Sequence, residues 1–215
     1  MKKIFSICVL GLGLAVLVSG AAAQQSFVKG GVAGVRGLHT RAVLPPHDIF
    51  SNCGTGCSSY DTASGYYVAG TGSEGAGQTL AVGFTPTQTV TFRFALTPNT
   101  NYTGVSGAGV SAFLLNGTAT GGPTSQLAAL TQGGTIPDYP TLRVVRYHGR
   151  VKLVKGTTYF LCETEPNSTA VMLWMLSNDD FTSPFWFQDG GACTGSLTWL
   201  NATGATAPAF KIRAL

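Results

Sequence analysis

Charged side chains are scarce in this chain, and their scarcity excludes some classes of protein. Asp, Glu, Lys and Arg make up 10% of the 215 residues, against roughly 25% in an average soluble domain. Long helices and coiled coils need a charged outer face, so the chain belongs to neither class. The 29 glycines instead indicate many turns between short strands.

Histidine and the usual catalytic motifs are also scarce. The chain has three histidines, no serine in a Gly-x-Ser-x-Gly turn, and no glycine-rich run that ends in the Lys-Ser/Thr of a phosphate loop. A glycan-active enzyme would need paired carboxylates, and the candidates are Glu163, Glu165, Asp179, Asp180 and Asp189. We expect these to be solvated loop acids. The sequence therefore predicts neither catalytic activity nor a cofactor nor a metal site.

Long apolar runs are absent except at the N-terminus. Lys2 and Lys3 precede an apolar stretch at residues 4–18, and small residues follow at 19–23. This is the pattern of a secretory signal peptide, residues 1–23. An uncleaved anchor is the alternative, because residues 4–23 have the length of a membrane span, but the last five are only weakly apolar. We predict a secreted protein, extracellular or periplasmic, that is not held in a membrane after cleavage.

The chain after the signal has the size of one domain. Residues 24–46 contain scattered glycines and end in two prolines, so they are interpreted as an N-terminal arm or linker. Residues 47–215 then form a single domain. Without the two lysines of the signal, eleven basic and nine acidic side chains remain, a formal charge of +2. This small excess predicts no nucleic-acid partner, and we expect a monomer.

Four cysteines remain after the signal, and an even number in an exported chain favours two disulfides. Gly54 and Gly56 between Cys53 and Cys57 can adopt the positive φ angles of a tight turn, so these two cysteines can approach each other. Cys162 and Cys193 would then form the second bridge. A zinc site and a thioredoxin-like redox motif are the weaker alternatives, because the spacing and the lack of nearby histidines fit neither.

Strand patterns fill the domain. The stretch "TVTFRFALT" alternates, which predicts a half-buried strand with Val90, Phe92, Phe94 and Leu96 on one face. Leu80, Val82 and Phe84 repeat the alternation. Further strands are predicted at 65–69, 109–115, 142–147, 150–154, 157–163, 170–176, 196–200 and 209–213, and one helical turn at 125–130. The predicted fold is all-β: an antiparallel β-sandwich, jelly-roll-like.

Several segments resemble a known family when they are taken in order. They are "IFSNCGTGCSSYDTASGYYVAGTGS", "QTLAVGFTPTQTVTFRFAL", "VSAFLLNGTATGGPTSQLAAL", "VKLVKGTTYFLC" and "LWMLSN". This order is similar to that of the bacterial exported choice-of-anchor domain proteins, type R, which often carry a PEP-CTERM sorting tail. The resemblance covers about residues 48–210 and departs at Phe160, where the family usually has Trp. It implies an exported β-domain without established enzymatic activity. The ending "AFKIRAL" lacks a sorting tail and implies a released protein.

Aromatic side chains are the best candidates for a binding site. Sugar rings present apolar C–H faces that pack on aromatic rings, while amide and carboxylate groups take their hydroxyls. Trp186 is the first candidate because Pro, Asp and Gly flank its segment, and Phe185, Gln188 and Asp189 lie beside it. Tyr66 and Tyr67 are further candidates, since one of two adjacent strand residues faces outward. Trp174 lies in a strand that is apolar on both faces and is predicted to be core.

Basic residues gather in one region, predicted as a hairpin with a turn at His148. They are Arg143, Arg146, Arg150, Lys152 and Lys155. A charged strand edge that discourages pairing with other chains explains them simply. A binding site for an anionic polymer is the alternative.

These observations together predict a secreted, non-catalytic β-sandwich that binds extracellular carbohydrate or cell-envelope material. A structural or matrix surface protein with no small ligand is the main alternative. A glycan-active enzyme that uses loop carboxylates is a further, weaker one.

Overall fold

The computed structural model describes residues 46–73, 77–103, 109–178, 183–190, 192–193, 198–202 and 204–215. The predicted signal peptide and all of the predicted arm except Pro46 lie outside these residues. One short 3-10 helix, η1 (Thr55–Cys57), accompanies twelve strands. The strands are β1 (His47–Ser51), β2 (Tyr60–Ala69), β3 (Gln78–Phe84), β4 (Val90–Thr103), β5 (Ser111–Thr118), β6 (Gly122–Gly133), β7 (Arg143–Leu153), β8 (Tyr159–Thr164), β9 (Val171–Ser177), β10 (Phe185–Asp189), β11 (Leu200–Asn201) and β12 (Lys211–Ala214).

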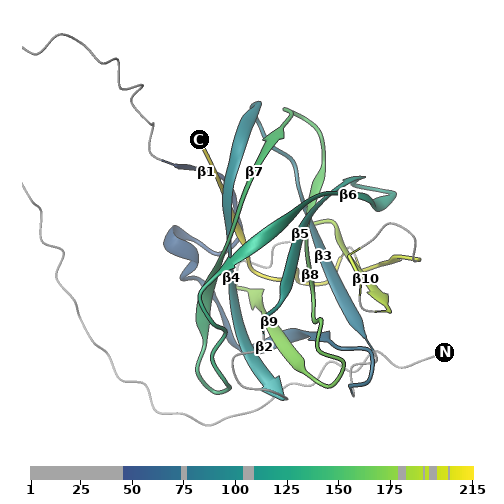
Figure 1. The fold of residues 1–215 in the computed structure, drawn as a ribbon. Coiled ribbons are helices and arrows are strands. Elements are labelled where there is room, and N and C mark those ends of the chain that lie inside the picture. Colours follow the sequence, from purple (N-terminus) through teal and green to yellow (C-terminus); the bar gives the residue numbers. More distant parts are fainter. Residues whose placement is uncertain are drawn as a thin grey trace, which may run out of the picture.

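The strands form two facing layers that share one continuous sheet. Layer A contains β1, β12, β4, β7, β9 and β2, and layer B contains β5, β8, β3, β10 and β11. Strand β6 pairs with β5 of layer B and with β7 of layer A, and it crosses obliquely between them in Figure 1. All pairs of named strands are antiparallel. The prediction of an all-β antiparallel sandwich is therefore confirmed.

The main core lies between the two layers. Leu80, Val82 and Phe84 of β3 point into it as the alternation predicts. Trp174 of β9 is fully buried there, and its indole N–H donates a hydrogen bond to the carbonyl oxygen of Ala209 at 2.7 Å. The expectation that Trp174 belongs to the core is confirmed.

Strand β4 departs from the predicted alternation at Arg93. The register of β4 shifts between Phe92 and Phe94 against its neighbours. Phe92 lies in the main core, whereas Phe94 and Leu96 pack on the opposite face of layer A. The single apolar face predicted for this strand is therefore wrong, because an irregularity of this kind exchanges the two faces of a strand.

Two other local predictions are also wrong. The segment predicted as a helical turn at 125–130 belongs to strand β6 and pairs there with β5. The two predicted strands around His148 form one strand, β7, and not a hairpin. Gly149 does not make a turn there: a Cβ atom on Gly149 would lie 2.6 Å from Leu130, so glycine lets β6 approach β7.

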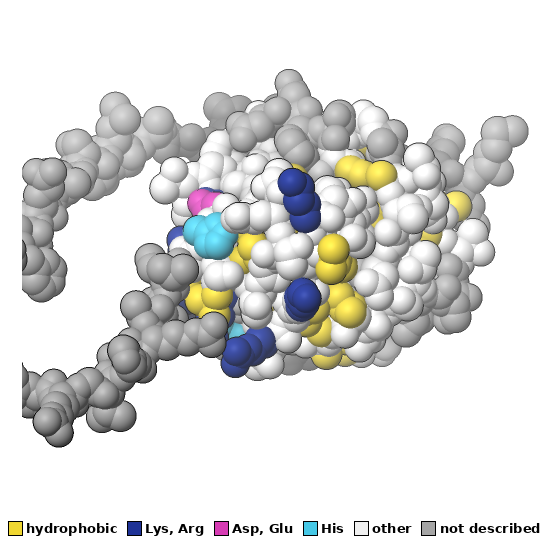
Figure 2. Space-filling model, turned by 90° about the horizontal axis from the view of Figure 1, so that it is seen from above, with side chains coloured by type: hydrophobic (Ala, Val, Ile, Leu, Met, Phe, Trp, Pro, Cys, Tyr) yellow, Lys and Arg dark blue, Asp and Glu magenta, His cyan; other side chains and the backbone are white. Residues whose placement is uncertain are grey.

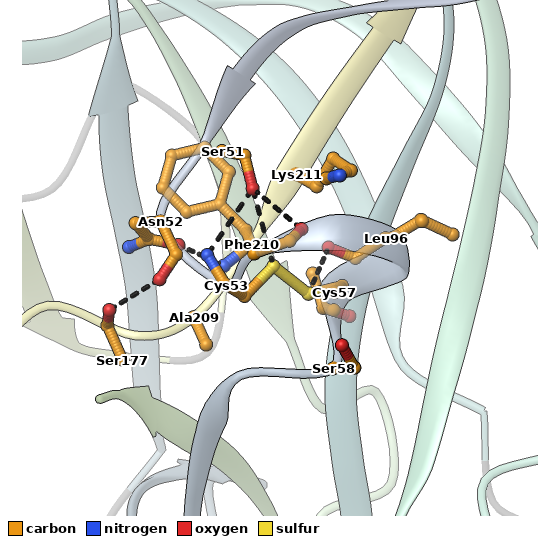
Figure 3. Close-up of a disulfide and its surroundings, with 12 residues drawn as sticks. Ser51, Asn52, Cys53, Cys57, Ser58, Leu96, Ser177, Ala209, Phe210 and Lys211 are labelled. Atoms are coloured by element: carbon orange, nitrogen blue, oxygen red, sulfur yellow. Dashed lines mark hydrogen bonds between the residues drawn. A yellow bond between two sulfur atoms is a disulfide. The ribbon is translucent and has the colours of Figure 1, made fainter. Parts of the chain in front are cut away.

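Both predicted disulfides are present. The Cys53–Cys57 bridge closes a loop in which Gly54 and Gly56 have φ angles of 67° and 65°. Figure 3 shows this loop beside Leu96 and Ala209, and with Phe94 these residues form the cluster on the outer face of layer A. Asn52 fixes the start of the loop, because its side chain donates to Pro208 O and accepts from the backbone N–H of Phe210.

The second bridge, Cys162–Cys193, lies on the outer face of layer B. Two disulfides indicate an oxidising compartment outside the cytoplasm. Within the described part of the chain, no helix is long and apolar enough to cross a membrane, and no group of three or more His, Cys, Asp or Glu side chains could hold a metal ion.

Candidate functional site

The exposed aromatic site predicted around Trp186 does not form. Trp186 is 7% exposed, Phe185 is 1% exposed and Gln188 is fully buried. The segment is not a loop but strand β10, which pairs with β3 on one side and with β11 on the other. Phe185 therefore points into the main core, and Trp186 packs with Phe160 and Cys193 on the outer face of layer B. Asp189 at the end of the strand is exposed.

Glycines make room for the rings on this face. A Cβ atom on Gly122 would lie 2.8 Å from the indole of Trp186, and a Cβ atom on Gly117 would lie 2.6 Å from the ring of Phe160. Both distances are too short for any side chain. The two aromatic rings therefore pack directly against Gly117 of β5 and Gly122 of β6, and the closeness of this packing explains why Trp186 is buried.

Tyr66 and Tyr67 point to opposite sides of β2. Tyr66 packs against the main core and its ring lies 4.7 Å from the ring of Phe185. Burial raises the pKa of the Tyr66 hydroxyl. Tyr67 lies on the other side of the strand and contacts Tyr102 of β4, with ring centroids 5.8 Å apart. The prediction that one of these two neighbours faces outward is confirmed, and Tyr67 is the one.

A third tyrosine extends this surface. Tyr139 contacts Tyr102 at a centroid distance of 5.9 Å with the rings nearly perpendicular. We call Tyr67, Tyr102 and Tyr139 the tyrosine row. The first two side chains are half-buried, and Tyr139 is 42% exposed. The row lies on layer A, where β2, β9 and the end of β4 come together at the bottom of Figure 1.

The loop that carries Tyr139 is fixed to β4 by hydrogen bonds. The backbone N–H of Asn101 donates to Pro137 O at 2.8 Å, and the N–H of Tyr139 donates to Asn101 O at 2.8 Å. The Asn101 side-chain amide also donates to the carboxylate of Asp138 at 3.0 Å. Residues 137–139 therefore act as a short extension of the sheet. They hold Tyr139 beside Tyr102, with the exposed Asp138 next to it.

Sequence reasoning missed two members of the tyrosine row. Tyr102 lies in β4 beyond Thr97, where the predicted strand ended, so the predicted alternation did not extend to it. Tyr139 lies in a Pro-Asp-Tyr-Pro turn, and turns of this composition are surface features. That composition is the one signal in the sequence for an exposed ring, but it does not show that the ring meets Tyr102.

A buried carboxyl group is the second unexpected feature. Glu163 is fully buried between the layers, although it was predicted to be a solvated loop acid. It follows Tyr159 and Leu161 in the alternation of β8, so it points into the main core as they do. That alternation was visible in the sequence. Glu165 is also buried, at 4% exposure, while Asp189 is exposed and Asp179 and Asp180 lie outside the described residues.

Neutral polar groups surround the Glu163 carboxyl. The side-chain amide of Asn99 on β4 donates to it at 3.2 Å and also lies 3.2 Å from the hydroxyl of Tyr147 on β7. Burial raises the pKa of Glu163 to about 8, although hydrogen bonds from Thr97 and Asn99 lower it. The pKa of Tyr147 is raised well above its usual value, first by burial and then by the charge of Glu163.

Carboxyl groups with a shifted pKa often belong to active sites. Glu163 is fully buried, however, and this argues for a structural role. A side chain with no accessible surface cannot contact a substrate. At neutral pH most Glu163 carboxyls hold a proton, so the cluster joins β4, β7 and β8 without a buried charge. It therefore ties layer A to layer B.

The tyrosine row is thus the strongest candidate for a functional surface among the described residues. No protein-family model matches the chain, and comparisons with curated proteins and with solved structures find no match either. The resemblance to choice-of-anchor domain proteins stays a prediction.

Proposed function

We propose that this protein is a secreted, non-catalytic β-sandwich that binds extracellular or cell-envelope carbohydrate through the tyrosine row. One observation carries the proposal: three tyrosines from β2, β4 and the loop after β6 form a continuous aromatic surface that is open to solvent at Tyr139.

The chemistry of the row suits a sugar chain. A pyranose ring presents C–H groups that pack on phenol rings, and the tyrosine hydroxyls can exchange hydrogen bonds with sugar hydroxyls. The carboxylate of Asp138, next to Tyr139, is exposed and can accept further ones. A site of this kind needs no net charge, which fits a chain with so few charged residues.

The row is also held rigidly, which favours binding. Tyrosine has few rotatable bonds, so its ordering costs little entropy on binding. Each ring of the row contacts its neighbour, and the backbone of Asn101 fixes the backbone around Tyr139. A surface that is preorganised before the ligand arrives loses less affinity to ordering.

The export of the protein rests on two features. The N-terminal sequence has the pattern of a signal peptide, and two disulfides favour an oxidising compartment. Polysaccharides of the envelope or the extracellular matrix are the carbohydrates that a protein in such a place meets.

A binding screen tests the proposal. The purified protein is incubated with insoluble cellulose, chitin, xylan and peptidoglycan and with soluble neutral glycans, and released sugar is measured in the same samples. We expect binding to at least one neutral glycan without release of sugar. Tyr139→Ala should weaken that binding roughly five- to thirtyfold, because a stacked ring contributes on the order of 1–2 kcal/mol. Tyr139→Phe should keep most of it.

Three outcomes would contradict the proposal. If the wild-type protein binds no glycan, the structural or matrix role replaces it. Release of sugar would favour an enzyme. Unchanged binding of the Tyr139→Ala and Tyr102→Ala variants would place the glycan site elsewhere.

A further inference from the structure

Strand β7 presents a line of basic side chains on the outer face of layer A. Val145, Tyr147 and Leu153 point into the main core. The residues that alternate with them point outward, and all four are exposed: Arg146, His148, Arg150 and Lys152. We call these four residues the cationic row, after the positive charges of Arg146, Arg150 and Lys152. It covers six residue steps of an extended strand, or about 20 Å.

The cationic row has no acidic neighbours on its own or the adjacent strands. The sequences of β4, β6 and β7 contain no Asp or Glu, and β4 adds the exposed Arg93. Asp48 of β1 pairs with Lys211 and Arg213 of β12, at 2.9 Å each. Figure 2 shows Lys and Arg side chains spread over one end of the sandwich with very little acidic surface between them. The positive charge of the row is therefore not neutralised by an acidic side chain on β7 or on the strands paired with it.

Protection of a strand edge accounts for only half of the row. Arg146 and His148 lie in a part of β7 that is paired on both sides, with β4 and with β6. A paired strand needs no charge against further pairing. Arg150 and Lys152 lie beyond the last described pair with β6, so edge protection can apply to them alone.

Contacts along the row hold it in place. The guanidinium of Arg146 lies 4.5 Å from the centre of the Phe94 ring, and the His148 ring lies 6.0 Å from the same ring. The irregularity in β4 that turns Phe94 outward therefore has a consequence: it supplies an aromatic support for two members of the row. On the other side the neighbours on β6 are small, with Thr131 opposite His148 and Gly133 opposite Arg146.

We propose that the cationic row binds a linear acidic polysaccharide, with guanidinium and ammonium groups paired to its carboxylates. Arginine suits this ligand because its planar fork matches a carboxylate. The Phe and Tyr rings of β7 and those of β4 beside the row, Phe92, Phe94 and Tyr147, are buried. The row therefore exposes one ring, His148, which is too few for a run of nucleic-acid bases to stack on. Thr131 and Gly133, the β6 residues opposite His148 and Arg146, carry no large apolar side chain that could enter a bilayer. Leu127 on β6 and Val154 after β7 are exposed, but two single apolar side chains make a weak membrane anchor.

Binding to polygalacturonate at low and high salt tests this site. We expect the wild-type protein to bind polygalacturonate and to bind the fully methyl-esterified polymer far more weakly. The double variant Arg150→Gln/Lys152→Gln should lose roughly tenfold in affinity, and the loss should shrink as salt rises. The matched control Arg143→Gln/Lys155→Gln removes the same charge from exposed residues outside the row. It should change the affinity less than about twofold.

The proposal fails if both double variants lose equally, because net charge and not the row would then be responsible. It also fails if the protein does not bind polygalacturonate, or if it binds duplex DNA or anionic phospholipid vesicles more tightly. The tyrosine row is tested separately: Tyr139→Ala should leave polygalacturonate binding unchanged, and Arg150→Gln/Lys152→Gln should leave neutral-glycan binding unchanged. Either site can therefore fail alone.

Discussion

The outer faces of the two layers both carry aromatic clusters, but only one of them is open. On layer B, Trp186 and Phe160 pack in one cluster with the bonded pair Cys162 and Cys193, and the half-buried Trp199 packs against this cluster. On layer A, Tyr102 contacts both Tyr67 and Tyr139, and Tyr139 is open to solvent. The difference shows that an aromatic-rich segment stays accessible to a ligand only where no other part of the chain covers it.

The largest expected difference between the two faces concerns stability. Trp186→Ala should lower the free energy of unfolding by about 3–5 kcal/mol, because it leaves a cavity among packed rings. Tyr139→Ala should cost less than about 1 kcal/mol, because that ring is 42% exposed. Urea unfolding of both variants measures the two values. Similar losses would mean that the two faces do not differ as described.

The disulfide on layer B should contribute more to the free energy of unfolding than the disulfide on layer A. The Cys162–Cys193 bridge spans 31 residues and the Cys53–Cys57 bridge spans 4. By the chain-entropy estimate, removal of the first costs about 3.5 kcal/mol and removal of the second about 2 kcal/mol. Double Cys→Ala variants of each pair, compared by thermal unfolding, test the order. A larger loss of stability for the Cys53–Cys57 variant would show that the Cys162–Cys193 bridge stabilises layer B less than we infer.

Ionisation of Glu163 should lower the stability of the whole sandwich, because its cluster lies in the core between the two layers. Because the pKa of Glu163 is about 8 in the folded protein and 4.5 is its ordinary value, the folded state binds more protons. The contribution of Glu163 to the free energy of unfolding is therefore fully present below pH 4.5. It falls as the pH rises towards 8 and then levels off. The fall between pH 5 and pH 8 should be about 3 kcal/mol.

Glu163→Gln supplies the matched control, since the amide has the same shape and cannot ionise. This variant should lose most of the dependence on pH, and it should be more stable than the wild-type protein at pH 8. Burial also raises the pKa of Glu165, so a smaller dependence of the same sign should remain. A wild-type protein that gains stability between pH 5 and pH 8 would contradict the buried neutral carboxyl.

Regular alternation and cysteine count allowed much of the fold to be predicted. The positions of Leu80, Val82 and Phe84 follow from the two-residue period of a strand, and the pairing of Cys53 with Cys57 follows from the tight Gly-Thr-Gly turn. These signals are local. Each can be evaluated from a few consecutive residues.

The predictions of side-chain position were wrong where contacts with strands distant in the sequence determine that position. The register of β4 against β7 and β12 exchanges its faces at Arg93, and no local pattern shows this. The burial of Trp186 depends on Gly122, which is far away in the sequence. Tyr139 was missed because its role depends on contact with β4. A local signal that was overlooked is the alternation of β8, which places Glu163 in the core.

Adjacent tyrosines on β2 offer the most direct test of the carbohydrate site. Tyr66→Ala and Tyr67→Ala are compared by melting temperature and by affinity for the neutral glycan that the wild-type protein binds. Tyr66 packs on the core, so its loss should lower the melting temperature by roughly 4–8 °C and leave affinity unchanged. Tyr67→Ala should change the melting temperature by less than about 3 °C and reduce affinity about tenfold. Unchanged affinity in Tyr67→Ala, or an equal loss in both variants, would contradict a glycan site on the tyrosine row.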